Sequence, residues 1–160
     1  MALFFAGPFL LMGKMQKTIR IRYLPGAHAI ELCDAGNWID LYTYRDTVLI
    51  RGEMKRISLG FAMEMPAGYE AHIVPRSSTF QRYGVLQANS VGIIDDNYCG
   101  DNDIWAFQAY ATRDVFIPEG TRVCQFRFVP TMLSTMGKIA FEAVDTLGNM
   151  DRGGFGSTGI

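Results

Sequence analysis

Short runs in which apolar and polar residues alternate extend along most of the chain. Residues 18–23, 56–63 and 69–73 carry apolar side chains at about every second position, and residues 104–111 and 121–129 form two further runs. A two-residue period matches the β-strand, in which successive side chains point to opposite faces. The pattern therefore predicts strands over these segments.

Turns rich in Gly and Pro separate these runs, for example Pro66-Ala67-Gly68 and Pro118-Glu119-Gly120. No stretch of helical length carries apolar residues with a 3.6-residue period, and only residues 77–83 are compatible with a helical turn. Many short strands with such turns between them are typical of a sandwich or barrel. With no internal repeat and no linker in the sequence, we expect an all-β fold in one domain.

The two ends of the chain differ from this central region. Residues 1–12 are apolar, but the segment has no basic start, and about 12 residues are too few to span a bilayer. We interpret residues 1–14 as an N-terminal extension, with a partner-binding arm as the alternative, and place the folded domain at 15–144. Residues 145–160 are rich in Gly and poor in apolar residues, so we expect a flexible tail; a frayed terminus is the simplest interpretation.

The composition indicates a globular protein whose main role is not to bind nucleic acid. Hydrophobic residues make up 49% of the chain and charged residues 19%, which is the balance of a folded domain. The net charge is −1, whereas nucleic-acid-binding proteins usually carry a basic surplus. Single nucleotides remain open as ligands. We expect a cytoplasmic protein without a membrane segment, located in the host cytoplasm if its source is a virus or phage.

Several residues that could carry chemistry are better explained as structural. The cysteines show neither disulfide nor zinc-finger spacing, and we interpret all three as reduced thiols: Cys33, Cys99 and Cys124. We interpret Trp38 and Trp105 as core or interface residues rather than as side chains that stack on a substrate.

Three stretches contain residue types suited to phosphate binding or to the activation of water. In the first, Pro75-Arg76-Ser77-Ser78, guanidinium, hydroxyl and backbone donors suit phosphate oxygens, although a solvated arginine is the alternative. The second, residues 91–103, contains four Asp and neither Lys nor Arg. A calcium-binding EF-hand would need a Glu where Ala106 or Phe107 stands, so that interpretation fails.

A solvated hairpin tip is the alternative for this acidic loop. Asp95, however, directly follows an apolar run, where we expect the partial burial that suits a general base. The third stretch, residues 152–159, has glycines that let backbone N–H groups approach a phosphate. It is not a Walker loop, because it lacks the Lys and only Ile160 follows where a helix should begin.

Taken together, these stretches resemble the trimeric dUTPase family, whose five motifs occur in order over about residues 34–159. Gly92-Ile93-Ile94-Asp95 through Tyr98-Cys99-Gly100 is a close match to the third motif. The other four motifs correspond to Asp34-Ala35-Gly36 through Asp40-Leu41-Tyr42, Pro75-Arg76-Ser77-Ser78, Pro118-Glu119-Gly120-Thr121-Arg122-Val123-Cys124-Gln125, and Gly153-Gly154-Phe155-Gly156-Ser157-Thr158-Gly159. Any one motif could occur by chance, but the ordered set is highly specific.

The resemblance implies a distorted jelly-roll β-barrel that forms a homotrimer, with each site built from three subunits. It implies hydrolysis of dUTP to dUMP and pyrophosphate, which limits uracil in DNA and supplies dUMP for dTMP synthesis. Arg76, Ser77 and Ser78 would hold phosphates, and Gln125 would contact phosphate from the fourth motif. The tail would fold over the nucleotide with these substrate contacts: Arg152, Phe155 stacking on uracil, Gly156, Ser157 and Thr158.

The resemblance also assigns the chemical step and the choice of base. Asp95 would orient and deprotonate the water that attacks the α-phosphorus. Asn89 and the backbone of residues 92–94 would read the uracil edge, and Tyr98 would pack under the deoxyribose and exclude a ribose 2′-hydroxyl. Mg²⁺ would sit on the triphosphate oxygens and waters, with Asp40 reaching it only through water.

Two motifs depart from the family pattern. The first motif usually runs Ala-Gly-Tyr-Asp, whereas Asn37-Trp38-Ile39 separates Gly36 from Asp40 here. In the fifth motif the γ-phosphate arginine of the family would align with Met150, and Arg152 stands two residues later. We expect Arg152 to reach the same place.

Two other functions remain open. A dCTP deaminase shares the fold, but that family uses a Glu for the chemistry at the base, where this chain has an Asp in the dUTPase pattern. A regulatory binding protein would use the nucleotide-dependent trimer as a switch for a protein partner. In that case we expect the partner to contact the apolar N-terminus or residues 131–144.

Overall fold

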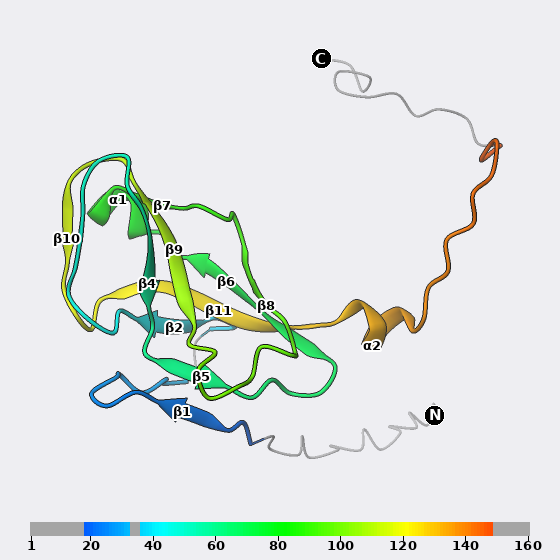
Figure 1. Ribbon diagram of the computed structural model, residues 1–160, viewed down its shortest axis with the longest axis horizontal. Coiled ribbons are helices and arrows are strands. Elements are labelled where there is room, and N and C mark those ends of the chain that lie inside the picture. Colours follow the sequence, from blue (N-terminus) through cyan, green and yellow to red (C-terminus); the bar gives the residue numbers. More distant parts are fainter. Residues whose placement is uncertain (1–17, 33–35, 149–160) are drawn as a thin grey trace, which may run out of the picture.

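The computed structural model describes residues 18–32 and 36–148, in which almost all regular elements are short strands joined by loops (Figure 1). The expected all-β fold is therefore confirmed. The described strands are β1 (Ile21–Tyr23), β2 (Ile39–Tyr42), β3 (Thr47–Leu49), β4 (Met54–Ser58), β5 (Phe61–Met63), β6 (Tyr69–Pro75), β7 (Val85–Gln87), β8 (Gly92–Ile94), β9 (Ala106–Ala111), β10 (Val115–Ile117) and β11 (Arg122–Pro130). The described helices are α1 (Thr79–Tyr83) and α2 (Met132–Met136).

Strands that are distant in the sequence pair with one another in this fold. The described strands form antiparallel sheets with the orders β2-β11-β6-β8, β4-β9-β7, β1-β5 and β10-β3. In the four-stranded sheet, Asp40 of β2 lies opposite Gln125 of β11, and Ile73 of β6 lies opposite Gly92 of β8. This sheet therefore carries residues from four of the five motifs.

The sheets enclose one hydrophobic core that is centred on aromatic side chains. Phe61, Trp105, Phe107 and Phe126 are fully buried, and the Trp105 ring centroid lies 5.0 Å from that of Phe61 and 5.2 Å from that of Phe126. Large aromatic side chains contribute most of the buried area in such a core. The core assignment of Trp105 is confirmed, and strands closed around a single core agree with a distorted jelly-roll barrel.

The strand predicted over residues 56–63 is in fact two strands, because the chain turns at Gly60. Gly60 has a φ of +79°, and an added Cβ would lie 2.7 Å from Cδ2 of Tyr44 and 2.8 Å from Cβ of Ala27. Only glycine tolerates both the left-handed backbone and this close approach. β4 consequently joins β9, and β5 joins β1.

The helical turn expected over residues 77–83 is confirmed as α1, whereas α2 was not predicted. Thr131 caps α2, since its side chain accepts a hydrogen bond from the backbone N–H of Ser134. The Ser134 hydroxyl donates to the carbonyl of Gly68 at 2.9 Å and ties α2 to the barrel. Every residue of α2 is exposed, so the sequence has no apolar stripe that would predict this helix.

Beyond α2, residues 137–148 form an extended arm that runs away from the barrel (Figure 1, orange). All residues of this arm are exposed, including Phe141, whose exposed fraction is 95%. The predicted domain boundaries stay a prediction, because residues 1–17 and 149–160 lie outside the described residues. Among the helices of residues 18–32 and 36–148, none has the length and apolar character needed to cross a membrane.

Candidate functional site

Residues from the four described motifs line two separate hollows, although the predicted phosphate contacts Ser77 and Ser78 line neither. The first, here called the Arg76 hollow, has a volume of about 540 Å³ and includes Asp40, Arg76 and Gln125 in its wall. The second, called the Asp95 hollow, has a volume of about 330 Å³ and includes Asp95 and Tyr98. The two hollows share no lining residue. Arg76 follows the end of β6, whereas the pairing of β6 with β8 places position 95 opposite residue 70, so Arg76 and Asp95 lie six residues or roughly 20 Å apart along the sheet.

The Arg76 hollow is organised by one carboxylate that contacts two arginines. Nε of Arg76 lies 2.8 Å from Oδ1 of Asp40, and both side chains are about a quarter exposed. Nη1 of Arg122 donates to Oδ2 of Asp40 at 3.4 Å. The carboxylate fixes Arg76 at the rim, while the remaining guanidinium nitrogens keep their donors. Arg122 belongs to the fourth motif, but sequence reasoning gave it no role.

The hydroxyl of Thr79 holds the chain after Arg76, and the hydroxyls of Ser77 and Ser78 make no hydrogen bond to another described residue. The Arg76 N–H donates to Oγ1 of Thr79 at 3.1 Å, and the Thr79 hydroxyl donates to the carbonyl of Val123 at 2.8 Å. Ser78 is the N-cap residue of α1, but its side chain makes no capping hydrogen bond. Ser77 is exposed, so both hydroxyls can serve as donors to an anion.

Gln125 and Trp38 complete the wall of the Arg76 hollow. Nε2 of Gln125 donates to the carbonyl of Pro75 at 3.4 Å, which leaves its Oε1 as the other polar end. The guanidinium carbon of Arg127 lies 4.8 Å from the centroid of the Trp38 ring. Trp38 is half-buried and borders the hollow, so its place differs from the fully buried core position of Trp105.

The Asp95 hollow is formed by β8, the loop that follows it and the outer face of β9. Gly92, Ile93 and Ile94 line it from β8, and Tyr98 lines it from the loop. The hydroxyl of Tyr98 donates to the carbonyl of Ile104 at 3.4 Å, which fixes the ring against the wall. Two further lining residues, Arg56 and Gln108, lie opposite each other on β4 and β9 and were missed by sequence reasoning.

Asp95 is exposed in the described chain, so the expected partial burial is wrong. Its Oδ1 accepts hydrogen bonds from the backbone N–H of Asn97 at 3.1 Å and from the Asn97 amide at 3.3 Å. The Asn97 N–H, together with a hydrogen bond from Asp96, lowers the pKa of Asp95. The same contact with Asp95 raises the pKa of Asp96. Asp95 is thus a carboxylate at neutral pH, as a base must be.

Asn89 stands at the rim of the Asp95 hollow beside a residue that the sequence did not flag. Nε2 of Gln87 donates to Oδ1 of Asn89 at 3.1 Å and to the carbonyl of Ile73 at 3.0 Å. A polar residue at the end of a strand carries no distinguishing signal, so sequence reasoning missed Gln87.

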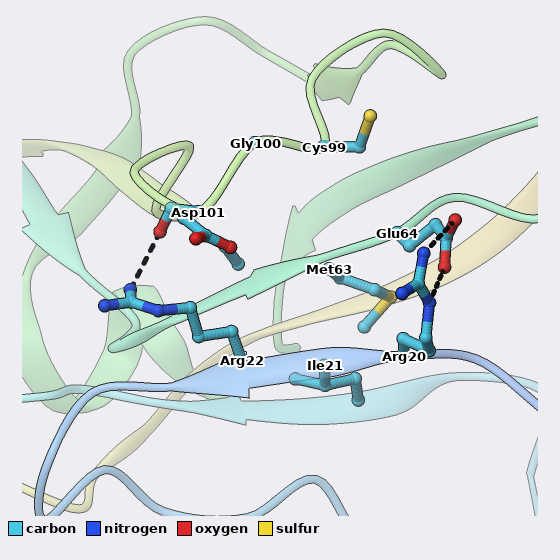
Figure 2. A pocket seen from close by; sticks show the side chains of 9 residues that line it. Arg20, Ile21, Arg22, Met63, Glu64, Cys99, Gly100 and Asp101 are labelled. Atoms are coloured by element: carbon cyan, nitrogen blue, oxygen red, sulfur yellow. Dashed lines mark hydrogen bonds and ion pairs between the residues drawn. The ribbon is translucent and has the colours of Figure 1, made fainter.

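A third hollow of about 390 Å³ lies where the acidic loop meets β1 and β5 (Figure 2). No residue predicted for the site lines it. Arg22 donates from Nη1 to the carbonyl of Asp101 at 2.8 Å and so ties the acidic loop to β1 (Figure 2). Arg20 makes two hydrogen bonds with Glu64 across β1 and β5, at 2.5 and 2.8 Å. The Arg22 contact therefore anchors the loop that carries Asp95.

The thiols do not contribute a nucleophile to either site hollow. Cys124 is buried in the core, and this burial, with the nearby Asp40 charge, raises the pKa of its thiol. Cys99 is exposed. Neither forms a disulfide in the described chain, and Cys33 lies outside the described residues.

The remaining predicted contacts cannot be placed. Five predicted substrate contacts lie outside the described residues: Arg152, Phe155, Gly156, Ser157 and Thr158. In the described chain, no group of three His, Cys, Asp or Glu side chains could hold a metal ion.

Comparison with known proteins identifies the family. A dUTPase family model matches residues 33–159. The SPbeta prophage-derived deoxyuridine 5′-triphosphate nucleotidohydrolase YosS of Bacillus subtilis is 50% identical over 142 residues, which cover 88% of this chain and 97% of that protein. A deoxyuridine 5′-triphosphate nucleotidohydrolase of Hydrogenobaculum sp. is 38% identical over 125 residues, covering 76% of this chain and 83% of the relative.

Solved structures show the same fold. A mutant dUTPase of Staphylococcus bacteriophage 80alpha, solved with dUpNHpp, gives a TM-score of 0.73 at 18% identity and covers 91% of this chain and 100% of its own. A mutant dUTPase from phage phi11 of Staphylococcus aureus, solved with a structural Mg(II) ion, gives a TM-score of 0.69 at 17% identity, covering 82% of this chain and 99% of its own.

Fold and motifs together define an all-β nucleotidohydrolase. The chain belongs to the dUTPase family, and its enzyme class is that of the dUTP diphosphatases.

Proposed function

We propose that this protein hydrolyses dUTP to dUMP and pyrophosphate at sites shared between the subunits of a homotrimer. One observation carries the proposal: the carboxylate suited to be the base and the arginine suited to hold phosphate line different hollows of one chain. A general base has to reach its proton within about 3 Å, directly or through one water. Asp95 and Arg76, roughly 20 Å apart along the sheet of one chain, can meet this requirement if they come from neighbouring chains.

In the proposed site, the Arg76 hollow of one subunit receives the triphosphate. Arg76 supplies guanidinium donors, Ser77 and Ser78 supply hydroxyl donors, and Gln125 adds a contact. Asp40 holds Arg76 in position through the 2.8 Å contact. Pairing with a carboxylate before the substrate arrives limits the rotamer freedom that binding would otherwise remove.

The Asp95 hollow of a second subunit supplies the base and recognises the nucleoside. Asp95 takes a proton from a water molecule while the oxygen of that water attacks the α-phosphorus. The bond from the α-phosphorus to the bridging oxygen breaks, and pyrophosphate leaves. Asn89 and the backbone of residues 92–94 read the uracil edge, and the ring of Tyr98 packs under the deoxyribose. The lowered pKa keeps Asp95 deprotonated between turnovers.

We also propose Mg²⁺ as the cofactor, carried on the triphosphate. The donor set fits a metal that keeps its water: two carboxylates, Glu31 and Asp40, border the Arg76 hollow, and Asp40 is already shared by two arginines. When bound, Mg²⁺ neutralises charge on the phosphate oxygens. Asp40 would reach it only through water.

The exposed arm supports assembly with a second copy of the chain. Its apolar residues are Ile139, Phe141, Val144 and Leu147. An apolar groove of about 210 Å³ on the barrel is lined by side chains that include Ile21, Ile39 and Phe128. Exposed apolar residues on an arm and an apolar groove on the same chain fit a contact repeated around a closed ring. We propose that the arm of one subunit occupies the groove of the next.

A pyrophosphate-release assay with Mg²⁺ and four nucleotides, dUTP, dCTP, dTTP and UTP, tests the proposed activity. We expect efficient cleavage of dUTP but not of dCTP, because polar groups that match uracil remain unpaired against cytosine. We expect little cleavage of UTP, because Tyr98 would exclude its ribose 2′-hydroxyl. Comparable turnover of dCTP and dUTP, or ammonia release from dCTP, would show that the substrate is wrong and would favour a deaminase. A role with a regulatory protein partner stays a prediction.

A further inference from the structure

Asn89 carries an amide whose two ends are chemically opposite. Oδ1 accepts hydrogen bonds and Nδ2 donates them, and rotation about the terminal torsion can exchange the two ends. Uracil and cytosine differ in the same sense, because uracil has a carbonyl acceptor at position 4 where cytosine has an amino donor. The orientation of the Asn89 amide at the rim of the Asp95 hollow therefore decides which base it can satisfy.

Hydrogen bonds from Gln87 fix this orientation. The carbonyl oxygen of Ile73 can only accept, so the end of the Gln87 amide that faces it, at 3.0 Å, has to be Nε2. The second hydrogen of Nε2 is directed to Asn89 at 3.1 Å, where the facing atom has to be Oδ1. The backbone of β6 thus sets the polarity of both amides.

The opposite end of the Asn89 amide is thereby a donor. Nδ2 lies on the side of Gly92, the first residue of β8, since a Cβ added to Gly92 would be 3.6 Å from it. Gly92 and Asn89 both line the Asp95 hollow. A base that enters this hollow therefore meets an N–H group of Asn89.

Two locally unfavourable features accompany this arrangement. Oε1 of Gln87 is buried and has no hydrogen-bond partner among the described residues, which an apolar side chain would avoid. Ser90, next to Asn89, has a φ of 59°, and its N–H closes the turn onto the carbonyl of Gln87 at 3.4 Å. Such strain and unsatisfied polar groups gather where function requires a fixed geometry.

We infer that Gln87 is a positioning residue that determines base specificity, because it holds Asn89 with its N–H donor toward the pyrimidine. This inference rests on the proposed dUTP hydrolysis and explains how the site rejects cytosine. Gln87 itself contacts no substrate and acts through Asn89.

Equilibrium binding of the non-hydrolysable imido analogues of dUTP and dCTP, with Mg²⁺, tests the inference. We expect Gln87→Leu to reduce the preference for the uracil analogue by about 10- to 100-fold, the effect of one lost or mismatched hydrogen bond that the bound base covers. Gln87→Glu has the same shape but only accepts when ionised, so it should turn from the carbonyl of Ile73, accept from Nδ2 of Asn89 and improve binding of the cytosine analogue. For dUTP turnover, KM should rise while kcat holds, because Asp95 and Arg76 are untouched.

Gln81→Glu is the matched control, since Gln81 is an exposed residue of α1 and the change in charge is the same. It should leave both affinities as in the wild type.

If Gln87→Glu or Gln87→Leu keeps the wild-type preference, or if the wild type binds both analogues equally, the inference is overturned. The proposed hydrolysis fails separately, if wild-type protein releases no pyrophosphate from dUTP. A variant that merely destabilises the fold would lose both analogues alike, and the isosteric Gln87→Glu separates that outcome from a loss of specificity.

Discussion

At the scale of single residues, Asp95 combines exposure with a lowered pKa, and the cause lies in its own loop. The backbone N–H of Asn97 donates to the carboxylate whatever side chain stands at position 97, so the turn itself stabilises the charged form. The proposed base therefore does not depend on burial within its own chain.

Replacing Asp95 with Asn tests its role directly. Asp95→Asn keeps the shape of the side chain but cannot take a proton, so kcat for dUTP should fall by roughly 10²- to 10⁴-fold. Binding of the imido analogue of dUTP should survive, because the phosphate contacts lie in the other hollow. A variant with near wild-type turnover would show that Asp95 is not the base.

The pH profile of kcat/KM should report the same carboxylate. Because the pKa of Asp95 is lowered, the active deprotonated form persists below the ordinary Asp range near 3.9, and activity should be lost only as pH falls through that lower value. Asp96→Ala removes the second contribution to this shift, so the acid limb should move to higher pH. Asp101→Ala removes the same charge from the same loop and should not move the limb upward; equal shifts in both variants would refute the assignment.

At the scale of elements, alternation predicted the segments that form β1, β4, β5, β6, β9 and β11, but it gave no run for β2, β3, β7, β8 and β10, which are only three or four residues long. It could not locate the break at Gly60, since Leu59 and Phe61 on either side are both buried. It also missed α2, which buries no residue and is held by its cap and by the Gly68 contact. Motif order named the candidate residues, but it could not predict either hollow, because sheet order depends on pairings between distant segments.

The turn at Gly60 should be sensitive to any side chain. Gly60→Ala combines a left-handed backbone with a clash against Tyr44 and Ala27, so the free energy of unfolding should drop by about 2–3 kcal/mol. Gly52→Ala is the matched control: its φ is +86°, but an added Cβ meets no atom within 4 Å, and about 1 kcal/mol is expected. Urea unfolding of both variants measures the difference, and equal losses would mean that the close approach has no effect.

At the scale of the whole molecule, the two hollows can be tested by mixing inactive proteins. Asp95→Asn lacks the base and Arg76→Ala lacks the phosphate ligand, so each alone should be nearly inactive. After refolding together, every mixed trimer should contain one intact site, and random mixing should restore about a quarter of all sites. No recovery after verified subunit exchange would mean that both hollows act within one chain, and the proposed shared site would be wrong.

The separation of the two hollows also sets how activity depends on the amount of protein made. Under the proposed assembly, a lone chain holds only part of each site. Where chains are mostly dissociated, the concentration of trimers varies as the cube of the chain concentration, so activity per chain falls with the square of dilution. A cell that expresses the gene weakly would gain almost no hydrolysis, and activity would rise steeply once expression passed a threshold.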